Sequence, residues 1–546
     1  MASTGTAHNS GTPTADALLV KRHANSQLPI NNLPPEVLLL MFKHYMASKP
    51  YDCLDYRWIR VTHVCYMWRE IALSAATLWS FLRITEFSLP ERVWVWLQRS
   101  QQAPLIFKAP MPSYGLYPSN GRVAIYGLIM AQLHRIQELD VAVTPGHFCR
   151  LQWPTTPINA LKHLNIDVQD IEDGQVEEAF SFRTDVDAAF PFLESLSIQH
   201  VPIELGVLRL PSSLTNLKLW DAGPPSATSV YQITTMLRGL HSLETLTIGR
   251  GLLQDTLASA SPLAIPVSLP RLRELRVEEH LIPCAQLLDL LVVPCGLRLV
   301  LTILVNNDTL PLLAEKGKSI VSWITKVSRP WPSVAFFSHP APILDDDHIP
   351  NQYSFMAGKE ATQSWGVDEP HDVYLNIEED DEPVADFYDS RQIDLFFEHF
   401  DYRSVKKVVV ATEEDNQPLL MTFLRMTAVE DLWFMGLDST PASYMPLLRP
   451  QSSARPLLFP RLMTLYITGQ WDEHPESGQP QARELPDVLL QRTSLGSPVG
   501  TLVIDRSLGS APEAYVNIQD QIRIMQAEDY SQVSAYFKTS KLEPRS

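Results

Sequence analysis

The sequence is poor in cysteine, in basic side chains and in long apolar runs, and each shortage excludes a class of protein. Its five cysteines, Cys53, Cys65, Cys149, Cys284 and Cys295, include no CxxC pair, which argues against a disulfide framework and a zinc site. Lys and Arg total 44 against 62 Asp and Glu, a formal charge of −18, which argues against a general phosphate-binding surface. We therefore expect a cytoplasmic or nuclear protein that binds neither nucleic acid nor membrane.

Long apolar runs and catalytic motifs are also missing. The most apolar window, 286–305, contains Asp289, Pro294 and Arg298, so we interpret it as a buried helix, a turn and a core strand rather than a membrane span. There is no GxSxG, P-loop, GxGxxG or HExxH pattern, and the fifteen histidines follow no metal-ligand spacing. We expect no enzyme activity, no cofactor and no metal.

Both ends of the chain are predicted to lie outside the folded domains. Residues 1–27 are rich in Ser, Thr, Ala, Gly and Asn and contain no apolar signal core. We expect them to be disordered, because they offer little apolar surface to offset the entropy of ordering. Residues 516–546 are assigned to a C-terminal tail.

A short repeated unit dominates the rest of the chain. The pattern apolar-x-x-apolar-x-apolar begins at Leu161, Leu193, Leu214, Leu243, Leu272, Val405, Val429, Leu462 and Val499. Helical segments lie between many of these copies. Each unit has an apolar edge that only a neighbouring unit can cover, so the units are expected to stack into a solenoid.

The unit resembles the leucine-rich repeat, a short strand followed by a helix, in a degenerate form. The resemblance implies an α/β solenoid with a curved parallel sheet over residues 86–515; the alternative is an α/β domain with ordinary core strands. We predict neighbouring parallel strands at 161–166, 193–198, 214–219, 243–248, 272–277, 429–434 and 462–467.

Alternation along these strands identifies a candidate binding face. If the apolar positions of the pattern point into the core, the third and fifth positions and the residue after the pattern point outward, onto the concave sheet that solenoids use for binding. Trp, Tyr and Arg are enriched at binding hot spots. The substrate-binding candidates are therefore Trp220, Arg276, Trp433 and Tyr466.

The middle of the chain fits the repeat poorly. A probable strand, DVYLNI, lies near two acidic runs, DDD at 345–347 and EEDDE at 378–382. Carboxylates are not buried without partners. We therefore predict that 340–390 is an irregular acidic insertion with little buried surface.

The N-terminal stretch LPPEVLLLMFKHYM, at 33–46, has too many apolar residues for one stripe of a helix: Val37, Leu38, Leu40, Met41, Phe42 and Tyr45. Such a helix must be covered on more than one side. A second helical segment runs from Trp58 to Trp79. Together they predict a compact helical unit at 28–85, which is small for an independent core. We expect it to lean on a partner or on the rest of the chain.

The order LPPEVLLLMF, then VCYMWREIA, then LW resembles the F-box, the helical module that binds a Skp1-type subunit of cullin-RING ubiquitin ligases. The matching positions are Leu33, Pro34, Glu36, Val37, Leu38, Met41, Phe42, Val64, Cys65, Trp68, Arg69, Leu78 and Trp79. The downstream segment is similar to large fungal F-box proteins that carry a degenerate leucine-rich-repeat array. The resemblance implies that the Leu-Pro opening docks into the partner.

These resemblances together imply a substrate-recognition adaptor of a Skp1-cullin-F-box ubiquitin ligase, built as a small all-α F-box bundle before the solenoid. Its partners would be a Skp1-type adaptor, through it a cullin, and a protein substrate that the sequence does not identify. Such an adaptor needs no catalytic residue, since it contributes proximity. The alternatives are a Skp1-binding scaffold outside the ligase and a small-molecule-sensing F-box receptor.

Overall fold

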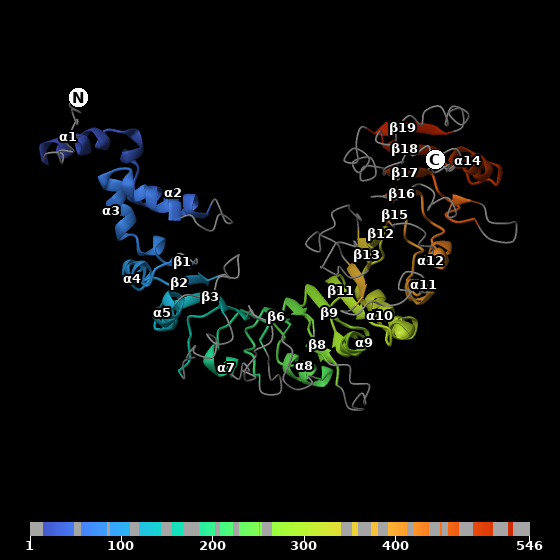
Figure 1. The fold of residues 1–546 in the computed structure, drawn as a ribbon, viewed down its shortest axis with the longest axis horizontal. Coiled ribbons are helices and arrows are strands. Elements are labelled where there is room, and N and C mark those ends of the chain that lie inside the picture. Colours follow the sequence, from blue (N-terminus) through green and yellow to red (C-terminus); the bar gives the residue numbers. More distant parts are fainter. Residues whose placement is uncertain are drawn as a thin grey trace, which may run out of the picture. The chain divides into compact units, whose positions relative to one another are not determined.

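The computed structural model describes residues 15–47, 56–84, 88–109, 120–143, 156–168, 185–201, 208–221, 229–250, 252–253, 265–339, 352–358, 373–379, 391–411, 419–435, 448–449, 457–468, 484–505 and 522–527. The chain forms two compact units, Met1–Phe180 with Thr184–His200, and Ser181–Arg183 with Val201–Ser546. Figure 1 shows the strands and helices of both units coloured along the sequence.

The first unit begins with a helical bundle. Its elements are α1 (Ala15–Ser26), η1 (Pro29–Asn32), α2 (Pro35–Ala47), η2 (Tyr56–His63), α3 (Tyr66–Ser74) and η3 (Ala76–Leu78). Pro35 opens α2, where its fixed φ suits a first helical position. Cys65 caps α3, because its Sγ accepts a hydrogen bond from the backbone N–H of Trp68 at 3.5 Å.

Helix α1 differs from the disorder expected for residues 1–27. Residues 15–26 are helical, whereas 1–14 lie outside the described residues. The segment ADALLVKRHANS consists largely of good helix formers. The helix is also held by contacts that sequence composition does not reveal: the Arg22 guanidinium lies 3.9 Å from the ring centroid of Tyr66, and the Asn31 side-chain amide donates to the Asn25 carbonyl at 2.6 Å.

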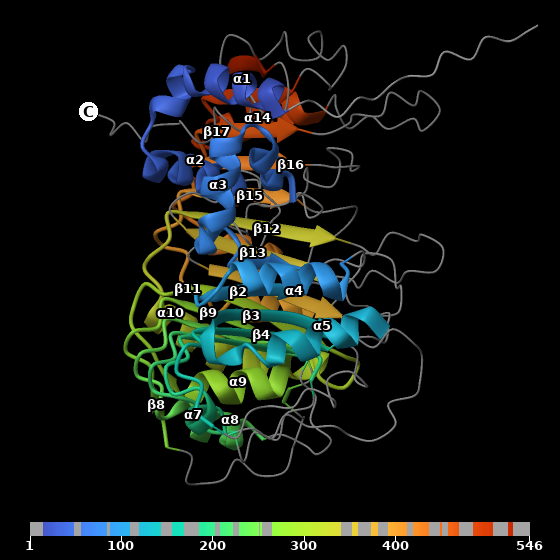
Figure 2. The same cartoon turned by 90° about the vertical axis from the view of Figure 1, so that its left-hand side faces the viewer.

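Five parallel strands follow the bundle in the first unit: β1 (Phe81–Arg83), β2 (Leu105–Ala109), β3 (Ile136–Val143), β4 (His163–Val168) and β5 (Ser195–Gln199). Each pairs with the next in parallel. The intervening helices are α4 (Pro90–Arg99), α5 (Asn120–Met130), η4 (Leu133–Arg135) and α7 (Val186–Ala189). Figure 2 shows α4 and α5 lying across the same side of β2, β3 and β4.

The second unit contains twelve strands of the same kind, β6 (Asn216–Trp220), β7 (Thr245–Ile248), β9 (Glu274–His280), β11 (Arg298–Val305), β12 (Ser333–His339), β13 (Gln352–Gly358), β14 (Val373–Glu379), β15 (Lys407–Ala411), β16 (Asp431–Met435), β17 (Thr464–Thr468), β18 (Thr501–Asp505) and β19 (Arg523–Ala527). The spatial order is β6, β7, β9, β11, β14, β13, β12, then β15 to β19. Only β13 runs antiparallel to its neighbours among these described strands. The prediction that 516–546 is a tail outside the folded domains is wrong at β19, because this segment pairs with β18 as a further parallel strand of the sheet. A separate parallel pair joins β8 (Val267–Ser268) and β10 (Leu291–Val292).

Helices cover one side of these twelve strands. They are α8 (Val230–Leu237), α9 (Leu281–Leu290), η5 (Leu310–Leu312), α10 (Leu313–Val327), α11 (Arg391–Phe397), α12 (Leu420–Leu424) and α14 (Glu484–Ser494). We call the opposite side of the twelve strands the helix-free face, since none of the described helices lies on it (Figure 1). The mostly parallel sheet with helices on one side confirms the coarse fold class expected from the repeated pattern.

The predicted strands pair in parallel within each unit. In the first unit β4 pairs with β5, and in the second β6 pairs with β7, β7 with β9, and β16 with β17. Five other strands separate β9 from β16. The window 286–305 also forms the predicted helix, turn and core strand, as parts of α9, β10 and β11. No described helix is long and apolar enough to span a membrane.

The prediction that 340–390 is an irregular insertion with little buried surface is wrong where the structure describes it, whereas the probable strand DVYLNI is confirmed within β14. Strands β13 and β14 lie inside the sheet, and Tyr353 and Phe355 are 2% and 0% exposed. The ring of Phe355 packs against Phe397 and Phe400, with centroids 5.7 and 5.1 Å apart. Alternating apolar side chains, rather than the flanking acids, decide the structure here. Residues 345–347 and 380–382 lie outside the described part of the chain.

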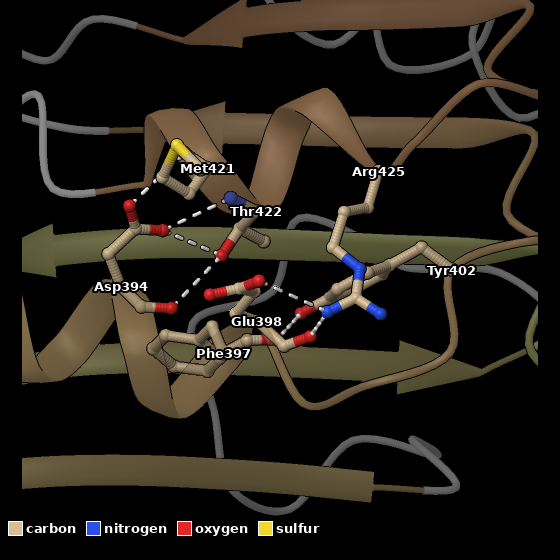
Figure 3. A network of polar contacts seen from close by, with 7 residues as sticks. All are labelled: Asp394, Phe397, Glu398, Tyr402, Met421, Thr422 and Arg425. Carbon is tan, nitrogen blue, oxygen red and sulfur yellow. Dashed lines mark hydrogen bonds and ion pairs between the residues drawn. The ribbon is translucent and has the colours of Figure 1, made fainter. Parts of the chain in front are cut away.

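Neighbouring helices in this region are joined by a buried polar network (Figure 3). The Asp394 carboxylate of α11 accepts hydrogen bonds from the backbone N–H groups of Met421 and Thr422, each at 3.1 Å, and from the Thr422 hydroxyl at 2.8 Å. These are donors at the start of α12 that have no partner within that helix. The Tyr402 hydroxyl donates to the Phe397 carbonyl at 2.8 Å and closes the turn after α11.

Candidate functional site

The N-terminal bundle has a small aromatic core. Leu38 and Phe42 of α2 are 0% and 2% exposed, and the Phe42 ring lies 5.0 Å from that of Trp68 on α3. The Trp68 indole N–H donates to the Asn31 side-chain oxygen at 2.8 Å, which ties α3 to η1. The Trp79 indole donates to the Ala72 carbonyl at the same distance.

This core continues into the rest of the first unit. The Trp79 ring packs edge-on against Trp58 and Trp96, at centroid distances of 4.9 and 5.0 Å. Trp96 belongs to α4, and Arg99 of the same helix lies 4.4 Å above the Trp79 ring. The bundle therefore leans on the chain that follows it, which is one of the two outcomes expected from its small size.

The thirteen positions that match the F-box separate by exposure. The buried ones are Leu38, Phe42, Leu78 and Trp79; the half-buried ones are Leu33, Cys65 and Trp68; the exposed ones are Pro34, Glu36, Val37, Met41, Val64 and Arg69. Burial of the first four accounts for the fold of the bundle. The exposed apolar members have no such role inside this chain.

An exposed apolar surface runs along α2. Val37, Leu40, Met41 and Tyr45 are 41%, 67%, 42% and 45% exposed, and their spacing places them on one face of the helix. We call these four residues the α2 apolar face. Contiguous exposed apolar side chains of this kind mark interaction sites. Leu40 and Tyr45 are absent from the thirteen matched positions, although the surplus of apolar residues in α2 already pointed to them.

On the helix-free face of the second unit, the strand register aligns one side chain from each strand into a row. The row runs Lys218, Thr247, Arg276, Val300, Tyr374, Met356, Ala335, Val409, Trp433, Tyr466, Val503, Met525. It is polar over the first three strands and almost entirely apolar from β11 onward. The two halves therefore have different chemistry.

The apolar half of the row forms a buried cluster that includes Trp433 and Tyr466. These two candidates lie on the predicted face, but they are 1% and 2% exposed, with ring centroids 6.4 Å apart. The Trp433 indole donates to the Thr468 hydroxyl at 3.1 Å. Both side chains thus contribute to a second buried cluster rather than to an open surface.

The polar half contains the other two candidates. Trp220 and Arg276 are half-buried, and the Arg276 guanidinium carbon lies 5.1 Å from the Trp220 ring centroid. The ammonium group of Lys218 lies 5.4 Å from the same centroid. The indole lies over Gly249 of the neighbouring strand end, where an added Cβ would come within 2.8 Å of its Cζ3 atom. Sequence analysis missed this role of Gly249, because it depends on strand register.

Two carboxylates beside Trp220 and Arg276 form ion pairs with another arginine, Arg250. Arg250 reaches Glu278 with Nε at 3.1 Å and Glu378 with Nη2 at 3.0 Å. The Asn376 amide also donates to Glu378 at 3.1 Å. Burial raises the pKa of Glu278, and the charges of Arg250 and Arg276 oppose that rise. We call Lys218, Trp220, Gly249 and Arg276 the cationic indole patch.

The outward positions of the first unit differ, since they hydrogen-bond to one another. The Asn165 amide donates to Asp140 at 2.7 Å, and the Gln199 amide donates to the Asn165 oxygen at 3.3 Å. His200 and Asp167 are paired at 2.7 Å. These side chains satisfy one another across neighbouring strands, so they need no ligand.

No protein-family model matches the chain, and no curated protein matches it significantly. The F-box and leucine-rich-repeat resemblances therefore rest on the order of residues in the sequence alone.

Proposed function

We propose that this protein is an adaptor that binds a Skp1-type partner through its N-terminal helical bundle and a protein substrate through its repeat domain. In this role it would bring the substrate to a cullin-RING ubiquitin ligase. The observation that carries the proposal is the α2 apolar face, which adjoins the Leu33-Pro34 opening and stays exposed in the chain.

The exposed pattern supports a partner rather than a defect of packing. The apolar residues of α2 that point to α3 are buried, so the bundle core is complete without the α2 apolar face. Exposing four large apolar side chains on one helix costs solubility, and a bound partner removes that cost by burying them. Helix-in-groove docking uses this spacing of apolar anchors.

The test is capture of a Skp1-type adaptor by the full chain. The double substitution Val37→Glu with Met41→Glu places two charges in the proposed interface, and Leu33→Ala with Pro34→Ala removes its proposed anchor. Loss of such anchors costs about 2–4 kcal/mol, so capture should weaken by about 30-fold to several hundredfold. The matched control, Val292→Glu with Leu495→Glu, changes two somewhat more exposed apolar residues of the second unit and should capture the adaptor like wild type.

Circular dichroism melting shows that each variant is folded. Undiminished capture by a folded Val37→Glu, Met41→Glu variant would rule out this surface as the Skp1 site. Cullin in the wild-type capture supports the ligase role, whereas the Skp1-type adaptor without cullin supports the alternative of a scaffold outside the ligase.

A further inference from the structure

We propose that the cationic indole patch binds an acidic peptide segment of the protein substrate, with Arg276 as the main contact. This inference rests on the proposed receptor role of the second unit. It concerns the helix-free face near β6, β7 and β9, where Lys218, Trp220 and Arg276 lie side by side.

The guanidinium of Arg276 has donors available for a ligand. Among the described residues, its guanidinium has a cation–π contact with Trp220 but no hydrogen bond or ion pair. A guanidinium carries five N–H donors in a planar fork that suits a carboxylate. Contact with the indole restricts its rotamers, so less entropy is lost when a carboxylate binds.

The carboxylates close to the patch are paired with arginines other than Arg276. The carboxylates nearest to Arg276 on its own strand are Glu274 and Glu278, and each is paired with another arginine: Glu274 with Arg298 at 3.6 Å, and Glu278 with Arg250 at 3.1 Å. Glu378 is likewise held by Arg250. Glu278 and Glu378 share the one guanidinium of Arg250, whereas Arg276 forms no ion pair among the described residues, so Arg276 is a positive charge of the patch beside Lys218. An anionic group complements it, in a protein whose formal charge is otherwise −18.

Three neighbouring strands contribute to the patch. Trp220 comes from the end of β6, Gly249 follows β7, and Arg276 lies in β9. Only glycine lets the indole lie over the end of β7, because an added Cβ would overlap the ring. An extended segment crossing these strands would therefore meet an aromatic ring with two cationic side chains close to it. Acidic and aromatic groups suit that surface.

The experiment measures binding of a fluorescein-labelled decaglutamate peptide to the full chain by fluorescence anisotropy at low salt. Arg276→Ala should weaken binding about tenfold or more, since hydrogen bonds to charged groups are strong. Lys218→Ala, on another strand, and Gly249→Ala, which displaces the indole, should each weaken it several-fold. The matched control is Arg403→Ala: Arg403 is an exposed arginine of the same unit, paired with Asp401 at 2.6 Å, and its loss should change nothing.

A wild-type chain that does not bind decaglutamate would overturn the proposal. Binding of decaglutamate by the Arg276→Ala and Lys218→Ala variants as tight as that of wild type would also overturn it. So would a loss of binding by Arg403→Ala as large as that by Arg276→Ala. Tighter binding of decalysine than of decaglutamate would overturn it as well, and would indicate a basic partner at Glu278 and Glu378. Capture of the Skp1-type adaptor is measured on the same variants and should be unchanged. Conversely, the Val37→Glu, Met41→Glu chain should still bind decaglutamate, so failure of this proposal is distinct from failure of the adaptor role.

Discussion

Single buried charged side chains connect elements that lie far apart in the sequence of this chain. Arg492 of α14 is 0% exposed, and its guanidinium donates to the carbonyls of Leu458 and Phe459 at 3.0 and 2.7 Å. Burial lowers the pKa of Arg492 to about 10, which leaves the side chain charged at neutral pH. It therefore joins α14 to the segment before β17 as a cation surrounded by backbone oxygens.

We predict that Arg492→Ala lowers the stability of the chain by about 2–4 kcal/mol, since it leaves a cavity and unpaired buried carbonyls. Arg492→Lys should lose less, because it keeps the charge but not the fork of donors. Thermal unfolding followed by circular dichroism measures both. Arg403→Ala is the control and should leave the melting temperature unchanged, as its ion pair is exposed. Equal melting of Arg492→Ala and wild type would show that the carbonyls find other donors.

Asp394 gives a prediction about pH. Burial raises the pKa of this carboxyl above its ordinary value, despite the hydrogen bonds from Thr422 and Met421. The folded chain therefore holds the proton more tightly than the unfolded one, and the contribution of Asp394 to stability falls as pH rises through the interval between the two pKa values. Asp394→Asn does not titrate. The stability of wild type minus that of Asp394→Asn should thus decrease from pH 4 toward pH 7 in parallel urea titrations; an increase would contradict the burial effect.

At the scale of elements, close packing between helices depends on one glycine. Gly317 lies in α10, where an added Cβ would come within 2.6 Å of Cε2 of Phe396 on α11. By contrast, Gly127 lies in α5 with open space where its Cβ would be. Replacing glycine by alanine should therefore lower the stability of the chain at position 317 and raise it at position 127.

We predict that Gly317→Ala destabilises the chain by about 1–3 kcal/mol through overpacking. Gly127→Ala should stabilise it by up to about 1 kcal/mol, because alanine loses less entropy in a helix. Melting temperatures of the two variants beside wild type measure the difference. If Gly317→Ala is as stable as Gly127→Ala, then α10 and α11 are not held as closely as the structure shows.

The order of the strands in the sheet depends on how whole helices and strands pack together. The repeated pattern predicted strands β4, β5, β6, β7, β9, β16 and β17 because their side chains alternate between a buried and an outward face. It did not predict the antiparallel strand β13 or its place between β12 and β14. Pairing of strands distant in sequence depends on which edges meet after the helices pack, and no local pattern contains that information.

At the scale of the whole molecule, the two units offer different surfaces for partners. The first presents the α2 apolar face, which suits another helical protein. The second presents the cationic indole patch, which suits an acidic segment. The proposed adaptor role requires two such independent surfaces, one for the ligase and one for the substrate, since an adaptor contributes by holding its two partners together.

By itself, the sequence determined which residues are apolar at helical or alternating spacing, and hence the bundle, the strand–helix units and the face of each strand. Those properties are local, since each depends on the periodicity of a short segment. Tertiary structure alone decided that Trp433 and Tyr466 are buried, that Trp220 lies over Gly249, and that Arg276 forms no ion pair or hydrogen bond among the described residues. These depend on strand register, which brings together side chains far apart in the chain.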